Sequence, residues 1–597
     1  MALQTDRHRP PDRHPIGHAV LVKGSQAGIR LVAGGGHDPV TVGRFVGLET
    51  GGSIVIGVVT SVTADPSGAP GREPTCAMDV MGEIRADGAG RSAYYRGVSD
   101  YPAIGDPAVA LTNADLRLVF DNPGAAAIRI GHLHQDPSIG AHVKVDEMLN
   151  KHFAVLGSTG AGKSSGVSVI IGEVLDAKPD LRIFFIDPHN EYGTCFGDRA
   201  EVLTPRNLRL PFWLFNFEEI VDVVFRGRPG LEEETEILAD VIPQAKAMAV
   251  AGKLALDRSP VRRSDARSTG FHVDTPVPYR LADLASLIED RRGKLDNRAY
   301  AGHYNRLLSR IETVRNDPRY GFMFDNANVG GDTMADVLAQ LFRLTPDGRP
   351  MTVMQLAGFP AEVVDSVVSV LCRMAFDFGL WSDGAVPILL VCEEAHRYAP
   401  ADRSVGFGPT RKAISRIAKE GRKYGVCLGL VTQRPAELDS TIVSQCNTVF
   451  AMRMANDRDQ AILRSAVSDA AATLLGFVPS LATREVFAFG EGLALPTRFR
   501  FNDLPPERIP RSEAVHLARL AKGSLDRAFL TTVVERWRGA TAGRAVPDDA
   551  AVIPAAPARP GAVAAQAGDP GYPGLRPSPP PMLRDATLRG FGGRSSP

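Results

Sequence analysis

The stretch FAVLGSTGAGKSSGVSVIIGEVL, residues 153–175, decides the fold. Its first apolar residues predict a buried strand, and the residues after Lys163 follow a helical pattern. The glycine-rich loop between them lets backbone amides converge on phosphate oxygens, and the N-terminus of the helix adds a favourable dipole. Strand, loop and helix in this order predict a P-loop; the alternative is a glycine-rich turn without a ligand.

This loop supplies the candidate phosphate-binding residues. We expect Lys163 to reach the β- and γ-phosphates of a nucleotide and the hydroxyl of Ser164 to bind Mg²⁺. The candidate nucleotide contacts are Gly157, Ser158, Thr159, Gly160, Ala161, Gly162, Lys163, Ser164 and Ser165.

Two carboxylates follow another apolar run, PILLVC, at Glu393 and Glu394. The carboxyl edge of a parallel sheet is where such folds bind ligands. We expect Glu393 to orient the shell of Mg²⁺ and Glu394 to polarise the attacking water, because phosphoryl transfer to water needs an in-line nucleophile as well as charge neutralisation. The alternative is a solvated acidic strand end.

Two further apolar runs end in polar residues. Gln433 follows CLGLVT, and its neutral amide could sense a γ-phosphate or a water without competing for Mg²⁺; the alternative is a capping amide. The segment from Asp187 to Tyr192, DPHNEY, follows RIFFI, and its acidic and imidazole groups could position water or Mg²⁺. Asp-Pro is ordinary turn chemistry, so we favour a turn for this segment.

Residues 411–423 contain six cations and one acid. On a helix, Lys412, Arg416, Lys419 and Lys423 would share one face. Three interpretations stay open: a solvated face, an arginine that reaches the γ-phosphate of a neighbouring subunit, or a contact with DNA phosphates.

The rest of the chain indicates an α/β protein with an all-β domain in front of it. Six apolar runs between residues 151 and 501, several followed by helical patterns, predict a parallel sheet covered on both faces. Short β-branched runs near the N-terminus predict a small antiparallel barrel or sandwich. The expected division is a flexible N-terminus at 1–14, the all-β domain at 15–120, the first part of the core at 121–216, a helical insertion at 217–331, the second part of the core at 332–503, C-terminal helices at 504–540 and a disordered tail rich in Pro, Gly and Ala at 541–597.

Composition narrows the functional classes. The 68 basic and 68 acidic residues cancel, which excludes non-specific DNA binding by the whole surface, so any nucleic-acid site must be local. The six cysteines form no CxxC pair, which argues against a zinc ribbon or a disulfide framework. No apolar segment is long enough to span a bilayer, and we therefore expect a cytoplasmic protein without a membrane partner.

With these motifs in place, the chain resembles the HerA family of hexameric DNA-translocating ATPases. The resemblance runs to about Phe501 and rests on the P-loop segment together with FFIDPHNEY, PFWLFNFEE, LLVCEEAHRYAP, ISRIAKEGRKYGVCLGLVTQRPAELDSTIVSQCNT and LPTRFRF. It implies a RecA-like core with an extra strand between the P-loop and carboxylate strands, an N-terminal HAS barrel, ATP and Mg²⁺ as cofactors, and a homohexamer that moves along double-stranded DNA, commonly beside a NurA-type nuclease or another effector.

The resemblance also implies roles for single residues. Lys163 and Ser164 would be nucleotide contacts, Glu394 the catalytic carboxylate and Gln433 the sensor. Arg416 and Arg422 are candidates for an arginine finger. Where relatives often have an arginine before the P-loop strand, this chain has Lys151, which cannot make a planar two-point contact with phosphate.

Two other functions are compatible with the sequence. The ring could be an ATP-regulated scaffold that recruits and activates an effector without processive translocation. A conjugative or FtsK-like DNA pump would share the core, but it should bring membrane segments or a DNA-reading winged helix, and the sequence indicates neither.

Overall fold

The computed structural model describes residues 13–32, 39–64, 73–86, 91–121, 127–228, 232–256, 270–294, 298–325, 331–345, 348–466 and 473–511, with a few more between 527 and 538. The chain divides into two compact units, 1–547 and 548–597, and all described residues belong to the first. The predicted tail, 541–597, and most of the predicted C-terminal helices, 504–540, lie outside the described residues. Arg13, expected in a flexible N-terminus, is held by Asp115 through an ion pair of 2.7 Å.

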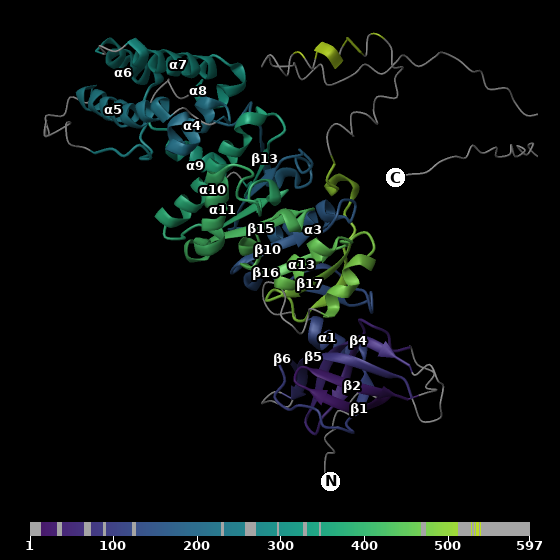
Figure 1. Ribbon diagram of the computed structural model, residues 1–597. Helices are drawn as coiled ribbons and strands as arrows, with labels where there is room; N and C mark the ends of the chain where they lie inside the picture. The colour runs from purple at the N-terminus through teal and green to yellow at the C-terminus, as the bar shows by residue number, and fades with distance from the viewer. Residues whose placement is uncertain are drawn as a thin grey trace, which may run out of the picture. The chain divides into compact units, whose positions relative to one another are not determined.

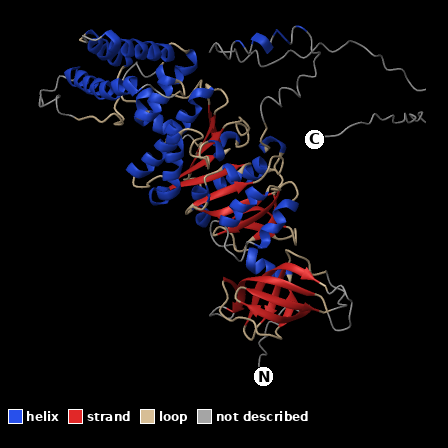
Figure 2. Cartoon of the chain, in the orientation of Figure 1, coloured by secondary structure: helices blue, strands red, loops and turns tan. Residues whose placement is uncertain are grey.

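The N-terminal strands form a small closed barrel (Figures 1 and 2). Its sheet has the order β2-β1-β7-β3-β4-β5-β6, and a further pairing of β2 with β5 closes the barrel. All pairs are antiparallel, and alternate residues point inward, among them Ala19, Ile29, Val55 and Met78. The prediction of a small all-β barrel is confirmed. Its strands are β1 (Pro15–Lys23), β2 (Gln26–Leu31), β3 (Phe45–Glu49), β4 (Ser53–Thr63), β5 (Thr75–Ala86), β6 (Ser92–Arg96) and β7 (Pro107–Ala110).

The core is one large sheet with the order β12-β13-β11-β14-β15-β10-β16-β17-β18-β8-β9. The first seven strands in this order are parallel, and the remaining four are antiparallel. The strands are β8 (Ala127–Leu133), β9 (Gly140–Lys144), β10 (His152–Leu156), β11 (Arg182–Asp187), β12 (Ala200–Leu203), β13 (Met351–Gln355), β14 (Ile388–Cys392), β15 (Val426–Thr432), β16 (Cys446–Met452), β17 (Glu485–Gly490) and β18 (Thr497–Phe501).

The sheet confirms the α/β prediction and corrects one part of it. The P-loop strand β10 and the carboxylate strand β14 are separated by β15, which is the arrangement that the resemblance implies. The predicted parallel sheet is in fact mixed, because the antiparallel strands β17, β18, β8 and β9 continue it beyond β16. The four-residue edge strand β12 was also missed.

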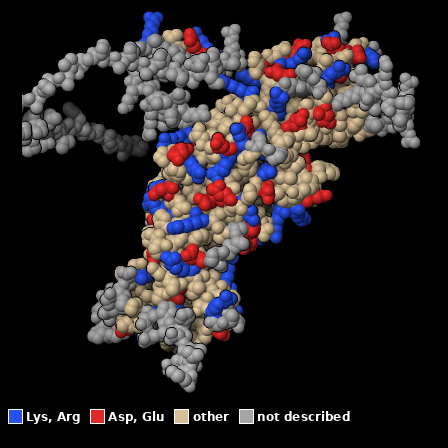
Figure 3. Space-filling model, turned by 180° about the vertical axis from the view of Figure 1, so that it is seen from behind, with Lys and Arg blue, Asp and Glu red and all other residues tan. Residues whose placement is uncertain are grey.

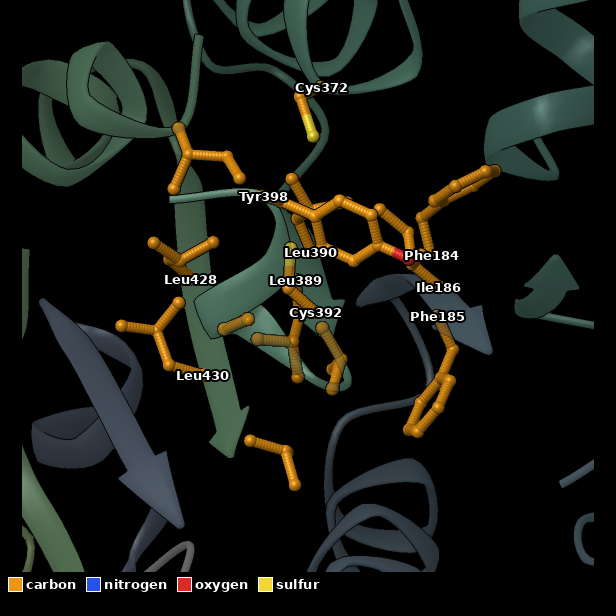
Figure 4. Close-up of a cluster of buried hydrophobic side chains, with 14 of the residues drawn as sticks. Phe184, Phe185, Ile186, Cys372, Leu389, Leu390, Cys392, Tyr398, Leu428 and Leu430 are labelled. Atoms are coloured by element: carbon orange, nitrogen blue, oxygen red, sulfur yellow. The ribbon is translucent and has the colours of Figure 1, made fainter. Parts of the chain in front are cut away.

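Buried apolar side chains hold the parallel strands against their covering helices. Every residue of β10, β13, β14 and β15 is buried, which is typical of strands covered on both faces. Figure 4 shows part of this core, in which side chains of β11, β14 and β15 lie beside Cys372 and Tyr398. The six cysteines are all buried and free.

Helices cover the sheet and also form the segment between β12 and β13 (Figure 1). In the core they are α2 (Val145–Leu149), α3 (Lys163–Ala177), α10 (Val364–Trp381), α11 (Gly408–Glu420), α12 (Ser440–Val443) and α13 (Asp457–Ala466), and α1 (Asn113–Phe120) follows the barrel. Between β12 and β13 lie α4 (Phe217–Phe225), α5 (Glu232–Leu256), α6 (Leu281–Gly293), α7 (Arg298–Arg315), α8 (Gly321–Phe324) and α9 (Met334–Phe342). No helix among the described residues is long and apolar enough to cross a membrane.

A buried charge network joins α4 to α10. Glu219 is fully buried and completes a capping box with Asn216 at the start of α4. Its carboxylate also accepts hydrogen bonds from Ser369 Oγ at 2.8 Å and from Arg373 Nη2 at 3.0 Å. The helical segment is therefore anchored to the core through an ion pair whose acid has no contact with solvent.

Candidate nucleotide-binding site

The P-loop lies at the carboxyl end of β10 and leads directly into α3. Two of its glycines have left-handed backbone angles, with φ of +76° at Gly160 and +95° at Gly162. A Cβ atom at Gly162 would lie 2.8 Å from the side chain of Arg484. Glycine is therefore required at Gly162 both by conformation and by the close approach of Arg484.

Neighbouring strands fix the path of the loop. The backbone N–H and the hydroxyl of Ser158 both donate to the carbonyl oxygen of Arg453, at 2.9 and 2.8 Å. The N–H of Gly157 donates to the carbonyl of Thr432 at 3.3 Å. Lys163 folds back over the loop, and its Nζ donates to the carbonyl of Ser158 at 3.2 Å. The ends of β15 and β16 thus hold the loop in a fixed shape.

The two carboxylates from β14 face this lysine. Burial lowers the pKa of Lys163, while the negative charges of Glu394 and Glu393 oppose that shift. Burial also raises the pKa of Glu393 well above its usual range, and the charge of Asp187 adds to the effect. Tyr192, which is fully buried, donates its hydroxyl hydrogen to Glu393 Oε1 at 3.1 Å. A cation at this position would relieve the unfavourable burial of the Glu393 charge.

Glu394 has a strained backbone and an acidic group enclosed by histidines. Its φ of +51° lies in the left-handed region, which costs a residue with a side chain about 1–2 kcal/mol. Its Oε2 lies 3.3 Å from Nδ1 of His396, and its Oε1 lies 3.9 Å from Nε2 of His189. Strain of this kind is found where the surrounding structure holds a functional group in place. The geometry is suited to a base that receives a proton from a bound water.

Gln433 contacts the P-loop directly. Its side-chain Oε1 accepts a hydrogen bond from the hydroxyl of Thr159, so the end of β15 is joined to the middle of the loop. An amide at this point can respond to the position of phosphate groups on the loop. The structure thus brings together four of the predicted groups: the P-loop with Lys163, both carboxylates and Gln433.

The turn after β11 brings one acidic group of DPHNEY to the P-loop, a possibility that the sequence analysis stated but ranked below a simple turn. The carboxylate of Asp187 accepts backbone N–H hydrogen bonds from His189, Glu191 and Tyr192, so Asp187 holds the turn, as we favoured. Glu191 instead reaches the P-loop, where its Oε2 accepts a hydrogen bond of 3.4 Å from the hydroxyl of Ser164. The only available signal was its place within DPHNEY, at the same sheet edge as the P-loop.

The oxygens around Ser164 fit Mg²⁺. Magnesium in nucleotide sites binds one or two protein oxygens together with phosphate oxygens and water, so it needs no complete protein cage. Among the described residues, no group of three or more His, Cys, Asp or Glu could hold a metal by itself. The Ser164 hydroxyl and Glu393, whose Oε2 is buried without a hydrogen-bond partner in the described structure, supply the oxygen ligands that such an ion prefers.

The predicted basic face of residues 411–423 is not continuous. Helix α11 ends at Glu420, and Lys423 lies in the following 3-10 turn, Gly421–Tyr424, rather than on the helix. Lys412 forms an ion pair of 3.0 Å with Glu218 of α4. Arg416 is also paired, with Asp377 of α10. Two of the four cations assigned to this face are therefore engaged within their own chain.

Arg416 packs against α10. Its guanidinium carbon lies 4.1 Å from the centre of the Phe376 ring, and its Nη1 lies 3.5 Å from Asp377 Oδ1. This contact orients the side chain toward α10, a neighbour that the sequence pattern of 411–423 could not reveal.

Arg422 and Lys151 lie at the opposite edge of the sheet from the P-loop. Lys151 precedes β10, and its ammonium group pairs with Glu491 at 2.8 Å. That hydrogen bond holds the pKa of Glu491 below its usual range, and the nearby charge of Arg422 contributes to the same shift. Five residues of β10 separate this edge from the P-loop, which is about 16 Å of extended chain. Arg422 is therefore on the wrong side of the sheet to serve the nucleotide site of its own subunit.

His152 joins the P-loop strand to α11. The N–H of Leu428 donates to its Nδ1 at 2.9 Å, so Nε2 carries the proton and donates to the carbonyl of Ala418 at 2.9 Å. Burial lowers the pKa of His152 and keeps the ring neutral. One buried side chain thus fixes the last turn of α11, which precedes Arg422, against β10 and β15.

Comparisons with known proteins agree with these features. Residues 128–375 match the family model described as "Helicase HerA, central domain". "Probable helicase MJECL08" of Methanocaldococcus jannaschii is 28% identical over 419 residues, which cover 66% of this chain and 74% of that protein. "DNA double-strand break repair helicase HerA" of Pyrococcus furiosus is 27% identical over 419 residues, covering 64% of this chain and 70% of that protein.

Solved structures give a more distant similarity. VirB4 of Thermoanaerobacter pseudethanolicus aligns with a TM-score of 0.43 and 16% identity, covering 64% of this chain and 98% of that one.

Proposed function

The chain belongs to the HerA family and is an enzyme of the P-loop ATPase and helicase type, and on that premise we propose that it is an ATP-driven motor that moves along double-stranded DNA as a ring of six copies. One observation supports this most strongly: the P-loop, two carboxylates from β14 and Gln433 from β15 meet at one edge of the sheet. This is the set of groups needed to bind a nucleoside triphosphate and to direct water at its γ-phosphate.

Each group has a distinct role in hydrolysis. Lys163 and the backbone amides of the P-loop bind the phosphates and stabilise the negative charge that develops on them. Glu394 accepts the proton of the attacking water, and His189 and His396 beside it enclose the carboxylate. Gln433 orients the water or senses the γ-phosphate. Ser164 and Glu393 would hold Mg²⁺, which would supply charge neutralisation for the phosphates.

The site is completed by a neighbouring subunit. Arg416 is held by Phe376 and Asp377, and Arg422 lies at the far edge of the sheet from the P-loop of its own chain. Arg422 can act only on the nucleotide of an adjacent copy, which requires a head-to-tail contact between core domains. Repetition of such a contact generates a ring when the rotation closes.

DNA binding is local in this proposal. Figure 3 shows one face of the molecule, on which basic and acidic residues are interspersed and no single basic surface covers the described elements. A ring that grips the phosphate backbone in its centre needs only a small basic patch from each copy, and its binding should be sensitive to salt and tolerant of sequence. We further propose that the motor works with a NurA-type nuclease or another effector in DNA repair or defence, in line with the repair role in the names of its relatives.

Two substitutions test the proposal. Lys163→Ala and Glu394→Gln should each abolish DNA-stimulated phosphate release from ATP, whereas Glu437→Gln, at an exposed residue paired with Arg434, should leave it unchanged. Displacement of a third strand from a DNA triplex then measures movement along the duplex. ATP-dependent displacement supports a translocase. Hydrolysis and ring formation without displacement would instead support an ATP-regulated scaffold, and unchanged turnover in either site variant would refute the assignment.

A further inference from the structure

Two large apolar side chains of the core are left exposed to solvent. Trp381 is 83% exposed and Val405 is 57% exposed. Outside the helices between β12 and β13, they are the only exposed large apolar residues in the described parts of residues 127–511. A single exposed apolar residue is common on a protein surface, but tryptophan has a large apolar area to bury and is enriched at the centres of protein interfaces.

Trp381 lies at the amino edge of the sheet, beside the turn that carries Arg422. It is the last residue of α10, and the chain then enters β14. The end of α10 packs on the 3-10 turn Gly421–Tyr424, because a Cβ atom at Gly379 would lie 2.7 Å from the carbonyl oxygen of Tyr424. The exposed tryptophan and the candidate arginine finger therefore share one edge of the core.

Val405 lies at the opposite edge, where the carboxyl ends of the strands meet. Its loop follows β14 and the turn Ala395–Arg397. A Cβ atom at the next residue, Gly406, would lie 3.5 Å from the carbonyl oxygen of Arg397, and the N–H of Arg397 donates to the carbonyl of Glu394 at 2.9 Å. Val405 is thus held close to the carboxylate that we assign to water activation.

The two edges also carry complementary charge. Arg422 and Lys423 are exposed at the amino edge, and neither forms an ion pair among the described residues. The carboxyl edge holds one lysine of the P-loop but three carboxylates, those of Glu191, Glu393 and Glu394, and the phosphates of a bound nucleotide would add negative charge. Opposite charges guide two surfaces into register and disfavour other orientations. The amino edge of one copy therefore matches the carboxyl edge of another copy better than it matches itself.

We propose that the amino edge of one subunit docks on the carboxyl edge of the next by packing Trp381 against Val405 of that copy. The inference rests on the proposed function, because it specifies the contact that an arginine acting between subunits requires. This packing brings Arg422 to the side of the neighbouring Glu394. Trp381 is a positioning residue, since it touches no substrate and acts through Arg422. The contact is head-to-tail, so its repetition builds a ring when the rotation closes.

Cross-linking of cysteines placed beside the two apolar residues tests the contact in the full-length protein. Ala385→Cys and Arg403→Cys are both at exposed positions and leave Trp381 and Val405 in place. The six native cysteines are buried, so a short bismaleimide should react with the added thiols. The two variants are purified separately and mixed in the presence of a non-hydrolysable ATP analogue and duplex DNA.

The mixture should give a covalent dimer, whereas neither variant alone should. Addition of Trp381→Ala to the first variant, or of Val405→Asp to the second, should remove this product. Met248→Ala, at an exposed apolar residue of α5, is the matched control and should leave it unchanged. A dimer of either variant alone would indicate a two-fold contact and would overturn the proposal. Absence of the mixed dimer, or its persistence in the Trp381→Ala background, would overturn it as well.

A second measurement separates positioning from a merely structural role. Trp381→Ala should raise the protein concentration at half-assembly at least about 30-fold, the effect of losing an interface hot spot, and DNA-stimulated turnover should fall with it. The Kd for ATP should not change, because all the phosphate-binding groups lie within one chain, and Trp381→Phe should restore turnover. Normal assembly and turnover of Trp381→Ala would contradict the proposal. Absence of ATP hydrolysis in the original protein would contradict the proposed function instead, whichever cross-links form.

Discussion

Under the proposed function, replacement of Arg422 and of Arg416 should have opposite consequences, because Arg416 is paired with Asp377, whereas Arg422 forms no ion pair among the described residues. Arg422→Ala is expected to reduce DNA-stimulated ATP hydrolysis by about 10³–10⁵, the rate effect of an arginine finger. At about 1.36 kcal/mol for each factor of ten, this is a loss of about 4–7 kcal/mol of transition-state stabilisation. The free energy of unfolding of one subunit should change little, since Arg422 forms no ion pair among the described residues.

The expected effect of Arg416→Ala follows from its contacts with α10. The ion pair with Asp377 is partly exposed, with 47% and 33% of the two side chains accessible, so it contributes about 0–1 kcal/mol. The contact with the Phe376 ring adds about 0.5–1 kcal/mol. Arg416→Ala should therefore lower the free energy of unfolding by about 0.5–2 kcal/mol and leave the turnover of the folded enzyme within a few-fold of its original value.

A mixture of two inactive variants tests most directly whether Arg422 acts on the nucleotide of an adjacent subunit. Neither Lys163→Ala nor Arg422→Ala should hydrolyse ATP alone. In a one-to-one mixture, about a quarter of the interfaces should combine an intact P-loop from one subunit with an intact Arg422 from the next, and turnover should reappear. Arg422→Lys should stay slow, because lysine cannot form the planar two-point contact with phosphate. Full activity of Arg422→Ala, or loss of activity in a stable Arg416→Ala protein, would refute the reasoning.

Three further outcomes follow from individual contacts. Glu219→Ala should destabilise the protein by about 1–3 kcal/mol in urea unfolding, because the N–H of Asn216 and the side chains of Ser369 and Arg373 lose their buried acceptor, although Arg373 keeps its ion pair with Asp377; a cost below about 1 kcal/mol would contradict this. The free energy of unfolding should fall as the pH drops below about 6.5. Burial lowers the pKa of His152 in the folded protein, so below this pH the unfolded chain binds a proton that the folded protein does not. His152→Gln should remove this part of the pH dependence in unfolding measured between pH 5 and 8. Gln433→Ala should lower kcat by about 10²–10³-fold with little change in KM. If KM instead rises by a similar factor, and Thr159→Val shows the same rise, then the role of Gln433 is to hold the conformation of the P-loop through Thr159.

Local sequence signals were sufficient for the centre of the site. The P-loop, the two glutamates after β14 and Gln433 after β15 each follow a buried apolar strand directly, so the parallel topology alone brings them to one edge. The central parallel strands could be predicted because fully buried strands are continuously apolar, whereas the place of β15 between the P-loop and carboxylate strands was implied only by the family resemblance. The same reasoning correctly favoured a turn at Asp187.

Features that depend on tertiary contacts could not be read from the sequence. The neighbour of Arg416 is a ring on α10, 40 residues earlier in the chain, and no spacing rule connects the two. Strand β12 has only four residues, too few to show a period. The antiparallel strands β17 and β18 pair with each other and with β8, from a distant part of the chain, so the continuation of the sheet depends on long-range pairing.

The strand order also determines which recombinant fragments of this protein can fold. The P-loop strand β10 is hydrogen-bonded to β15 on one side and to β16 on the other, and both lie after residue 375, where the stretch matched by the family model ends. A recombinant fragment of residues 128–375 would contain the whole P-loop, but the apolar strand β10 would have no hydrogen-bonded neighbour on either side. Such a fragment should aggregate rather than bind nucleotide. Expression designs for the ATPase core should instead extend from β8 to beyond β18, since those two strands are neighbours in the same sheet.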